Sequence, residues 1–184
     1  MCAIPPIIGV QKKRIVFLSY MPKLAVLRSA LITDRLSLRL VVMSRKISNL
    51  CIIDDDPMSS FYIKRLAELG EVASIITIYN NAQGAIDYLL NYKKSSENLP
   101  DIILLDIYMP GIDGWGFLAE FQKLKHTLPK KMEIYVISSS DHPNDIKRAK
   151  ATPEVVDYFQ KPVTMELLKG IVNDFFKEDN EMKS

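Results

Sequence analysis

The sequence is poor in cysteine and histidine, and it has no long uninterrupted run of apolar residues. Its 184 residues include two cysteines, Cys2 and Cys51, which are too few for a disulfide scaffold and fit a reducing, cytoplasmic compartment. The two histidines, His126 and His142, are isolated, so no zinc motif is present. No charge-free stretch approaches the roughly 18 apolar residues of a membrane-spanning helix. We therefore expect no membrane association.

Charge is distributed unevenly along the chain. The formal net charge is +2, yet residues 1–42 hold seven basic side chains against one acidic side chain, a net charge of +6. Residues 43–184 hold the other 17 basic and 21 acidic side chains, a net charge of −4. The positive balance belongs to the leader alone, so the acidic remainder predicts no nucleic-acid partner.

Residues 1–46 form a basic N-terminal extension for which three interpretations stay open. Met43-Ser44-Arg45-Lys46 resembles a natural N-terminus placed just ahead of the first strand, in which case Met1 would be a mis-called start. The second interpretation is a basic, amphipathic, presequence-like segment. The third is a genuine but disordered extension. We expect one domain over residues 47–178 and a polar tail over residues 179–184.

Short apolar runs alternate with segments of helical periodicity after the leader. The runs typical of buried strands are residues 50–53, 74–79, 102–105, 134–137 and 155–159. The segments typical of helices are residues 58–69, 81–92, 115–125, 144–151 and 165–176. Strands that do not alternate polar with apolar residues are covered on both faces. The pattern therefore predicts an α/β fold with a five-stranded parallel sheet, doubly wound by helices.

Apolar spacing also predicts which face of the first helix packs on the sheet. Met58, Phe61, Tyr62, Leu66 and Leu69 recur at intervals of three to four residues. This spacing is typical of the core-facing side of an amphipathic helix.

Carboxylates, hydroxyls and a lysine follow four of the predicted strands. Three aspartates (residues 54–56) follow the first strand, Asp106 the third, three serines (residues 138–140) the fourth, and Lys161-Pro162 the fifth. The carboxyl ends of parallel strands share one edge of the sheet, where ligands bind. Crowded carboxylates repel one another, and Mg²⁺ is the natural ion to neutralise them. The sequence therefore predicts a magnesium site at this edge.

The order of these motifs is similar to that of a known family. They are Asp54-Asp55, Asp106-x-x-Met109-Pro110-x-x-Asp113-Gly114, Ser138 and Lys161-Pro162. Over residues 49–177 they resemble the receiver domain of response regulators, in the stand-alone form. The resemblance implies a flavodoxin-like (βα)5 fold and a phosphorylation-dependent switch in two-component or phosphorelay signalling.

The resemblance also implies partners and a limited chemistry. A histidine kinase or histidine phosphotransfer protein would supply the phosphoryl group, and a downstream effector protein would read the changed surface. The chain would be no enzyme beyond catalysing its own phosphorylation and dephosphorylation. Because only a short polar sequence follows residue 176, we expect no output domain on this chain.

For the metal and the acceptor, the resemblance implies four residues. Asp106 would be the phosphoacceptor, a carboxylate nucleophile, and also a Mg²⁺ ligand. Asp55 would bind Mg²⁺ directly and Asp54 through a metal-bound water. The backbone carbonyl of Tyr108 would complete the protein's share of the metal shell.

For the phosphoryl group and the switch, it implies three further residues. Lys161 would pair with a phosphate oxygen and Ser138 would donate its hydroxyl, although Ser139 is an alternative to Ser138. Tyr158 would be the switch aromatic, turning inward once Ser138 moves toward the phosphoryl group. Tyr158 could equally be a half-buried strand residue with no switching role.

Other interpretations of the same residues are plainer. Asp56 before Pro57 is typical of a helix N-cap, and Asp113-Gly114 is typical of a turn. A small phosphohydrolase with an aspartyl-phosphate intermediate usually carries its nucleophile and its acid/base as Asp-x-Asp after the first strand; the pair Asp54-Asp55 lacks that spacing, and the expected nucleophile here follows the third strand. A flavin or nucleotide module needs a glycine-rich phosphate loop there, and three aspartates stand in its place.

Overall fold

The computed structural model describes residues 46–181. Predictions about residues 1–45 of the leader and residues 182–184 of the tail lie outside the described residues. The elements in chain order are β1 (Ile47–Ile53), α2 (Pro57–Leu69), β2 (Ala73–Tyr79), α3 (Ala82–Asn91), β3 (Ile102–Leu105), α4 (Gly114–Leu124), η1 (Lys125–Thr127), β4 (Glu133–Ser138), α5 (Pro143–Ala151), β5 (Val155–Gln160) and α6 (Met165–Glu181). Among these described residues, no helix is both long and apolar enough to cross a bilayer.

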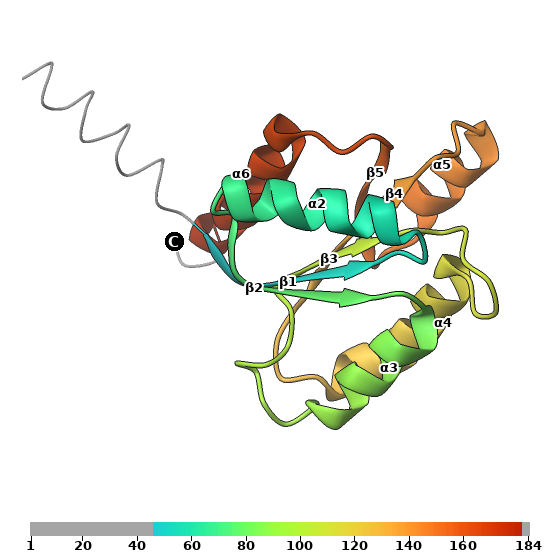
Figure 1. The fold of residues 1–184 in the computed structure, drawn as a ribbon. Coiled ribbons are helices and arrows are strands. Elements are labelled where there is room, and N and C mark those ends of the chain that lie inside the picture. Colours follow the sequence, from blue (N-terminus) through green and yellow to red (C-terminus); the bar gives the residue numbers. More distant parts are fainter. Residues whose placement is uncertain (1–45, 182–184) are drawn as a thin grey trace, which may run out of the picture. The chain divides into compact units, whose positions relative to one another are not determined.

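The five strands form one parallel sheet in the order β2-β1-β3-β4-β5. Helices cover both faces: α2 and α6 lie on one side of the sheet, and α3 and α4 on the other (Figure 1). The predicted doubly wound α/β fold is confirmed. The order of the strands reverses between β1 and β3, which is the place where such sheets hold their ligands.

The central strands are mostly apolar because both of their faces are buried. In β1, Cys51 and Ile53 pack in the core beneath α3 and α4, whereas Leu50 and Ile52 pack in the core beneath α2 and α6. Successive side chains of a strand point to opposite faces, so a strand buried on both sides shows no polar alternation. The parallel sheet predicted from these apolar runs is confirmed.

The predicted buried face of α2 is wrong at four of its five residues, whereas Leu66 is partly buried and packs against the core beneath α2 and α6. Met58, Phe61 and Leu69 are 73%, 63% and 63% exposed, and Tyr62 is 50% exposed. The helix instead buries Ser60, Ile63 and Ala67, each of which lies next in sequence to a residue of the predicted face. Small side chains let the helix approach the sheet closely, so the larger apolar residues remain on the outside. The result is an exposed apolar surface on α2, and the first turn of this helix lies beside the strand ends.

Side chains at the helix starts fix where the loops end. Asp56 accepts a hydrogen bond from the backbone N–H of Met58 (2.9 Å) and caps α2, with proline at the first helical position, as predicted. Asp113 accepts from the N–H of Gly116 (2.7 Å) and caps α4. Asp56 and Asp113 therefore cap helices and do not belong to the acidic cluster at the strand ends.

Candidate functional site

The backbone carries the candidate residues directly from the sheet to its carboxyl edge. The N–H of Asp106 donates to the carbonyl of Ile53 (2.8 Å), and the N–H of Lys161 donates to the carbonyl of Ser138 (2.8 Å). These bonds extend the strand pairing by one residue beyond β3 and β5. The side chains that follow are thus held by the sheet rather than by a free loop.

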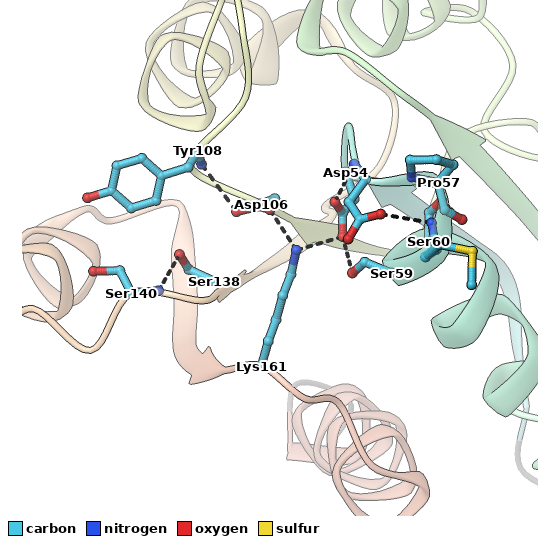
Figure 2. Close-up of polar contacts among 11 residues, drawn as sticks. Asp54, Pro57, Ser59, Ser60, Asp106, Tyr108, Ser138, Ser140 and Lys161 are labelled. Atoms are coloured by element: carbon cyan, nitrogen blue, oxygen red, sulfur yellow. Dashed lines mark hydrogen bonds and ion pairs between the residues drawn. The ribbon is translucent and has the colours of Figure 1, made fainter.

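Three carboxylates and one ammonium group meet at this edge. Figure 2 shows the Lys161 side chain reaching toward Asp54 and Asp106. Asp54, Asp55 and Asp106 each offer an oxygen, and these oxygens lie within 4.8 Å of one another. The Nζ atom of Lys161 lies 2.8 Å from Asp54 Oδ2 and 2.6 Å from Asp106 Oδ2. Asp54 and Asp106 are only 2% and 7% exposed, so little water screens their charges.

The two aspartates after β1 have different surroundings. Asp54 Oδ2 accepts from the Ser59 hydroxyl (2.6 Å), and its Oδ1 accepts from the N–H of Asp56 (3.0 Å). Asp55 is half-buried, and within the described residues its carboxylate makes no hydrogen bond or ion pair. Asp55 is therefore the carboxylate whose oxygens are available for a ligand, because both oxygens of Asp54 already accept hydrogen bonds.

Lys161 remains charged in this setting. Burial lowers the pKa of its ammonium group, but hydrogen bonds to Asp106 and Asp54 outweigh that effect and raise the pKa above its ordinary value. Because the folded-state pKa is the higher one, the stabilisation is complete below the ordinary lysine pKa and is lost only as pH rises through the raised value. The ion pairs are thus intact throughout the neutral range.

The cluster suits a divalent cation. Three carboxylates against one ammonium group leave two negative charges in a poorly hydrated position. Mg²⁺ prefers oxygen ligands and commonly binds one or two carboxylates together with waters and phosphate oxygens. The half-buried Asp55, with its oxygens unengaged, fits such an ion from its accessible side.

The two candidate serines after β4 differ in burial. Ser138 is fully buried at the strand end and its Oγ accepts from the N–H of Ser140 (3.1 Å), whereas Ser139 is exposed. Tyr158 is 9% exposed and packs with Ile107 in a small cluster beneath α5, and its hydroxyl donates to the carbonyl of Ser140 (2.6 Å). The ring therefore lies inward, in the orientation that the family resemblance associates with the phosphorylated switch.

Tyr108 contributes more than its predicted carbonyl. Its N–H donates to Asp106 Oδ1 (3.2 Å), and its hydroxyl donates to Asp145 Oδ2 on α5 (2.6 Å). That hydrogen bond raises the pKa of Tyr108, and the same bond, together with one from Ser140, lowers the pKa of Asp145. Sequence reasoning did not single out Asp145 or Ser59, since nothing in their spacing marks them.

Gly114 allows the loop after β3 to fold back tightly. A Cβ atom at this position would lie 2.4 Å from the backbone oxygen of Asp106 and 2.6 Å from Cα of Ile107. The N–H of Gly114 also donates to the carbonyl of Ile107 (3.1 Å). The Asp-Gly pair is therefore more than a turn, because only glycine lets α4 begin against the backbone of the candidate acceptor.

The comparisons with known proteins agree on one family. The family model described as the response regulator receiver domain matches residues 50–173. A solved two component response regulator from Cytophaga hutchinsonii is 30% identical with a TM-score of 0.66, and the match covers 72% of this chain and 99% of that one. The probable methanogenesis regulatory protein FilR2 of Methanothrix harundinacea is 25% identical over 123 residues, 67% of this chain and 77% of that protein.

A plant relative shows the same segment within a much longer protein. The two-component response regulator ARR2 of Arabidopsis thaliana is 31% identical over 120 residues, which make up 65% of this chain and 16% of ARR2. The matched segment of this chain runs from β1 into α6 and includes every strand-end residue described above. The chain therefore belongs to the response regulator receiver domain family, whose members signal through a phosphorylated aspartate.

Proposed function

We propose that this chain is a signalling switch that accepts a phosphoryl group on Asp106 from a histidine kinase or a histidine phosphotransfer protein. The observation that carries the proposal is the carboxylate of Asp106, held at the sheet edge by Lys161 on one oxygen and by the N–H of Tyr108 on the other. A carboxylate oxygen forms the new O–P bond as the P–N bond of phosphohistidine breaks, and the released imidazole nitrogen takes up a proton.

The acidic cluster supports a role for Mg²⁺ in this transfer. Asp55 and Asp106 would bind the ion directly, Asp54 through water, and Tyr108 through its backbone carbonyl. When bound, the ion supplies positive charge that offsets the carboxylates and the phosphoryl oxygens. Asp54, already bonded to Ser59 and Lys161, would serve mainly to hold that charge in place.

Lys161 and Ser138 would stabilise the phosphoryl group after transfer. Phosphorylation replaces one negative charge with about two and adds three acceptor oxygens. The Lys161 ammonium group already lies against Asp106 and can pair with one oxygen, and the buried Ser138 hydroxyl can donate to another. Receiver domains are generally switches rather than enzymes, and the output would be a surface that an effector protein binds.

The wild-type protein tests this proposal directly. Incubation with acetyl phosphate and Mg²⁺ should add the mass of one phosphoryl group, and hydroxylamine should remove it, because an acyl phosphate is cleaved by that nucleophile. Adding a chelator with the donor should prevent the gain in mass. A label that survives hydroxylamine, or no label at all, would contradict the proposal.

The exposed apolar face of α2 supports docking of the phosphoryl donor beside the site. Met58 and Phe61 lie in the first two turns of a helix that begins directly after the three aspartates, and both are largely exposed. Exposed apolar patches next to polar residues commonly mark protein interaction sites. A donor that must bring its histidine to Asp106 would cover this part of the helix.

Substituting Phe61 should slow phosphotransfer from a protein donor without slowing labelling by acetyl phosphate. We expect Phe61→Ala to slow phosphotransfer from a cognate phosphotransfer protein about tenfold, since a buried aromatic anchor is lost from the interface. Labelling by acetyl phosphate should be unchanged because the small donor needs no docking. Leu90→Ala, on α3 at the opposite face of the sheet, is the control and should leave both rates unchanged. Equal slowing with both donors would place Phe61 in the site itself.

A further inference from the structure

A hydrogen-bonded cluster beside the acidic site ties three separate segments together. Asp145 Oδ2 on α5 accepts from the Tyr108 hydroxyl (2.6 Å) and from the Ser140 hydroxyl (2.7 Å). Tyr108 belongs to the loop after β3 and Ser140 to the loop after β4. One carboxylate oxygen thus joins the loop of the candidate acceptor, the loop of the candidate hydroxyl and the first turn of α5.

Ser140 connects the same cluster to both switch residues. Its N–H donates to Ser138 Oγ (3.1 Å) and its carbonyl accepts from the Tyr158 hydroxyl (2.6 Å). Figure 2 shows the Tyr108 ring extending from the Asp106 loop on the same side as Ser140 and Ser138. The position of Ser140 therefore determines where the Ser138 hydroxyl lies and whether Tyr158 has an acceptor in its buried position.

The buried face of α5 is small and consists of Ala149 with the partly buried Ile146, which pack in the cluster that contains Tyr158. The helix buries only Ala149, whereas α2 buries three residues and α3 and α4 bury four each. Arg148 stacks over the Trp115 ring at 4.1 Å, a contact at the surface. Because little apolar area anchors α5, the hydrogen bonds to Asp145 contribute a large share of what orders its first turn.

We propose that Tyr108 and Asp145 are positioning residues: acting through Ser140, they hold the β4–α5 loop and keep Tyr158 buried before any phosphoryl group arrives. The inference deepens the proposed function and rests on it for its consequence. A switch whose loop is already ordered needs less rearrangement on phosphorylation than one whose loop must first fold. The Tyr108 hydroxyl then sets the resting state of the switch, separately from the backbone carbonyl that would serve the metal.

Hydrogen exchange of the full chain, without phosphoryl donor, tests the positioning role. Tyr108→Phe keeps the ring and removes the hydroxyl, and exchange of amides in residues 139–151 should rise about tenfold, as expected for one lost hydrogen bond to a charged group. Ser140→Ala, which keeps the backbone bonds to Ser138 and Tyr158, should have a similar effect. Tyr62→Phe, an exposed tyrosine on α2, should leave these residues unchanged.

A second readout follows Tyr158 itself. In protein labelled with fluorotyrosine, the Tyr158 signal, assigned with Tyr158→Phe, should move toward that of an exposed tyrosine in Tyr108→Phe. Acetyl phosphate with Mg²⁺ should then change exchange in residues 139–151 less in the wild type than in Tyr108→Phe. Unchanged exchange and an unmoved Tyr158 signal in the donor-free variant would overturn the positioning role. Since those two measurements need no phosphoryl group, they stand even if Asp106 proves not to be the acceptor.

Discussion

Asp106→Asn should reduce phosphoryl labelling by acetyl phosphate or by a phosphorylated donor protein to background. An amide oxygen is a far weaker nucleophile than a carboxylate, so the O–P bond does not form. The fold should survive, because the single asparagine oxygen can still accept from Lys161, and that ammonium group keeps its bond to Asp54. Intact mass after incubation with donor and Mg²⁺ gives the labelling, and thermal unfolding checks the fold.

The matched control for this substitution is Asp56→Asn. Asp56 lies two residues beyond Asp54, yet its side chain is spent on capping α2, and asparagine caps helices about as well. Labelling of Asp56→Asn should equal that of the wild type. Full labelling of Asp106→Asn, stable to hydroxylamine, would move the acceptor to another residue and contradict the proposed site.

The candidate site could be predicted from the sequence because its residues directly follow the strands. Once the runs without polar alternation were assigned to a parallel sheet, Asp54, Asp106 and Lys161 had to meet at one edge, whatever the loops did between them. The choice of Ser138 over Ser139 came instead from the family resemblance; in the structure Ser138 ends β4 and Ser139 lies one residue farther along.

The buried face of α2 could not be predicted in that way. Periodicity gives the apolar side of a helix, but this helix has larger apolar residues outside and Ser60, Ile63 and Ala67 inside. Which stripe is buried depends on how closely the helix approaches the sheet, and that distance is not written in the spacing of Met58 and Phe61. The mismatch between pattern and burial is itself what indicates an interaction surface.

The Tyr108–Asp145 hydrogen bond could not be predicted from the sequence either. The two residues are separated by 37 positions, and their meeting depends on the path of two loops. Nor could the sequence show that Tyr158 is buried, since its position depends on the carbonyl of Ser140. Strand ends are placed by the backbone pattern, whereas side-chain networks between loops need the coordinates.

Replacing Lys161 by methionine should destabilise the metal-free protein by about 3 kcal/mol, because one partner of a buried charged group is removed while the others stay. Asp54 and Asp106 would then face each other with no cation between them. Methionine keeps the length of the aliphatic stem, so the loss reports on charge rather than packing. Denaturant unfolding in the presence of a chelator measures the change.

Magnesium should reverse most of this loss. The Lys161 ammonium group and the ion neutralise the same carboxylates, so removing the lysine should increase Mg²⁺ affinity and make the rise in melting temperature on adding Mg²⁺ larger than in the wild type. Lys177→Met is the control: its pair with Asp174 on α6 is exposed, and its loss should change stability by no more than about 0.5 kcal/mol, with the wild-type response to Mg²⁺. An equal response to Mg²⁺ in Lys161→Met and the wild type would mean that lysine and ion do not share Asp54 and Asp106, and the ion would then have to bind elsewhere.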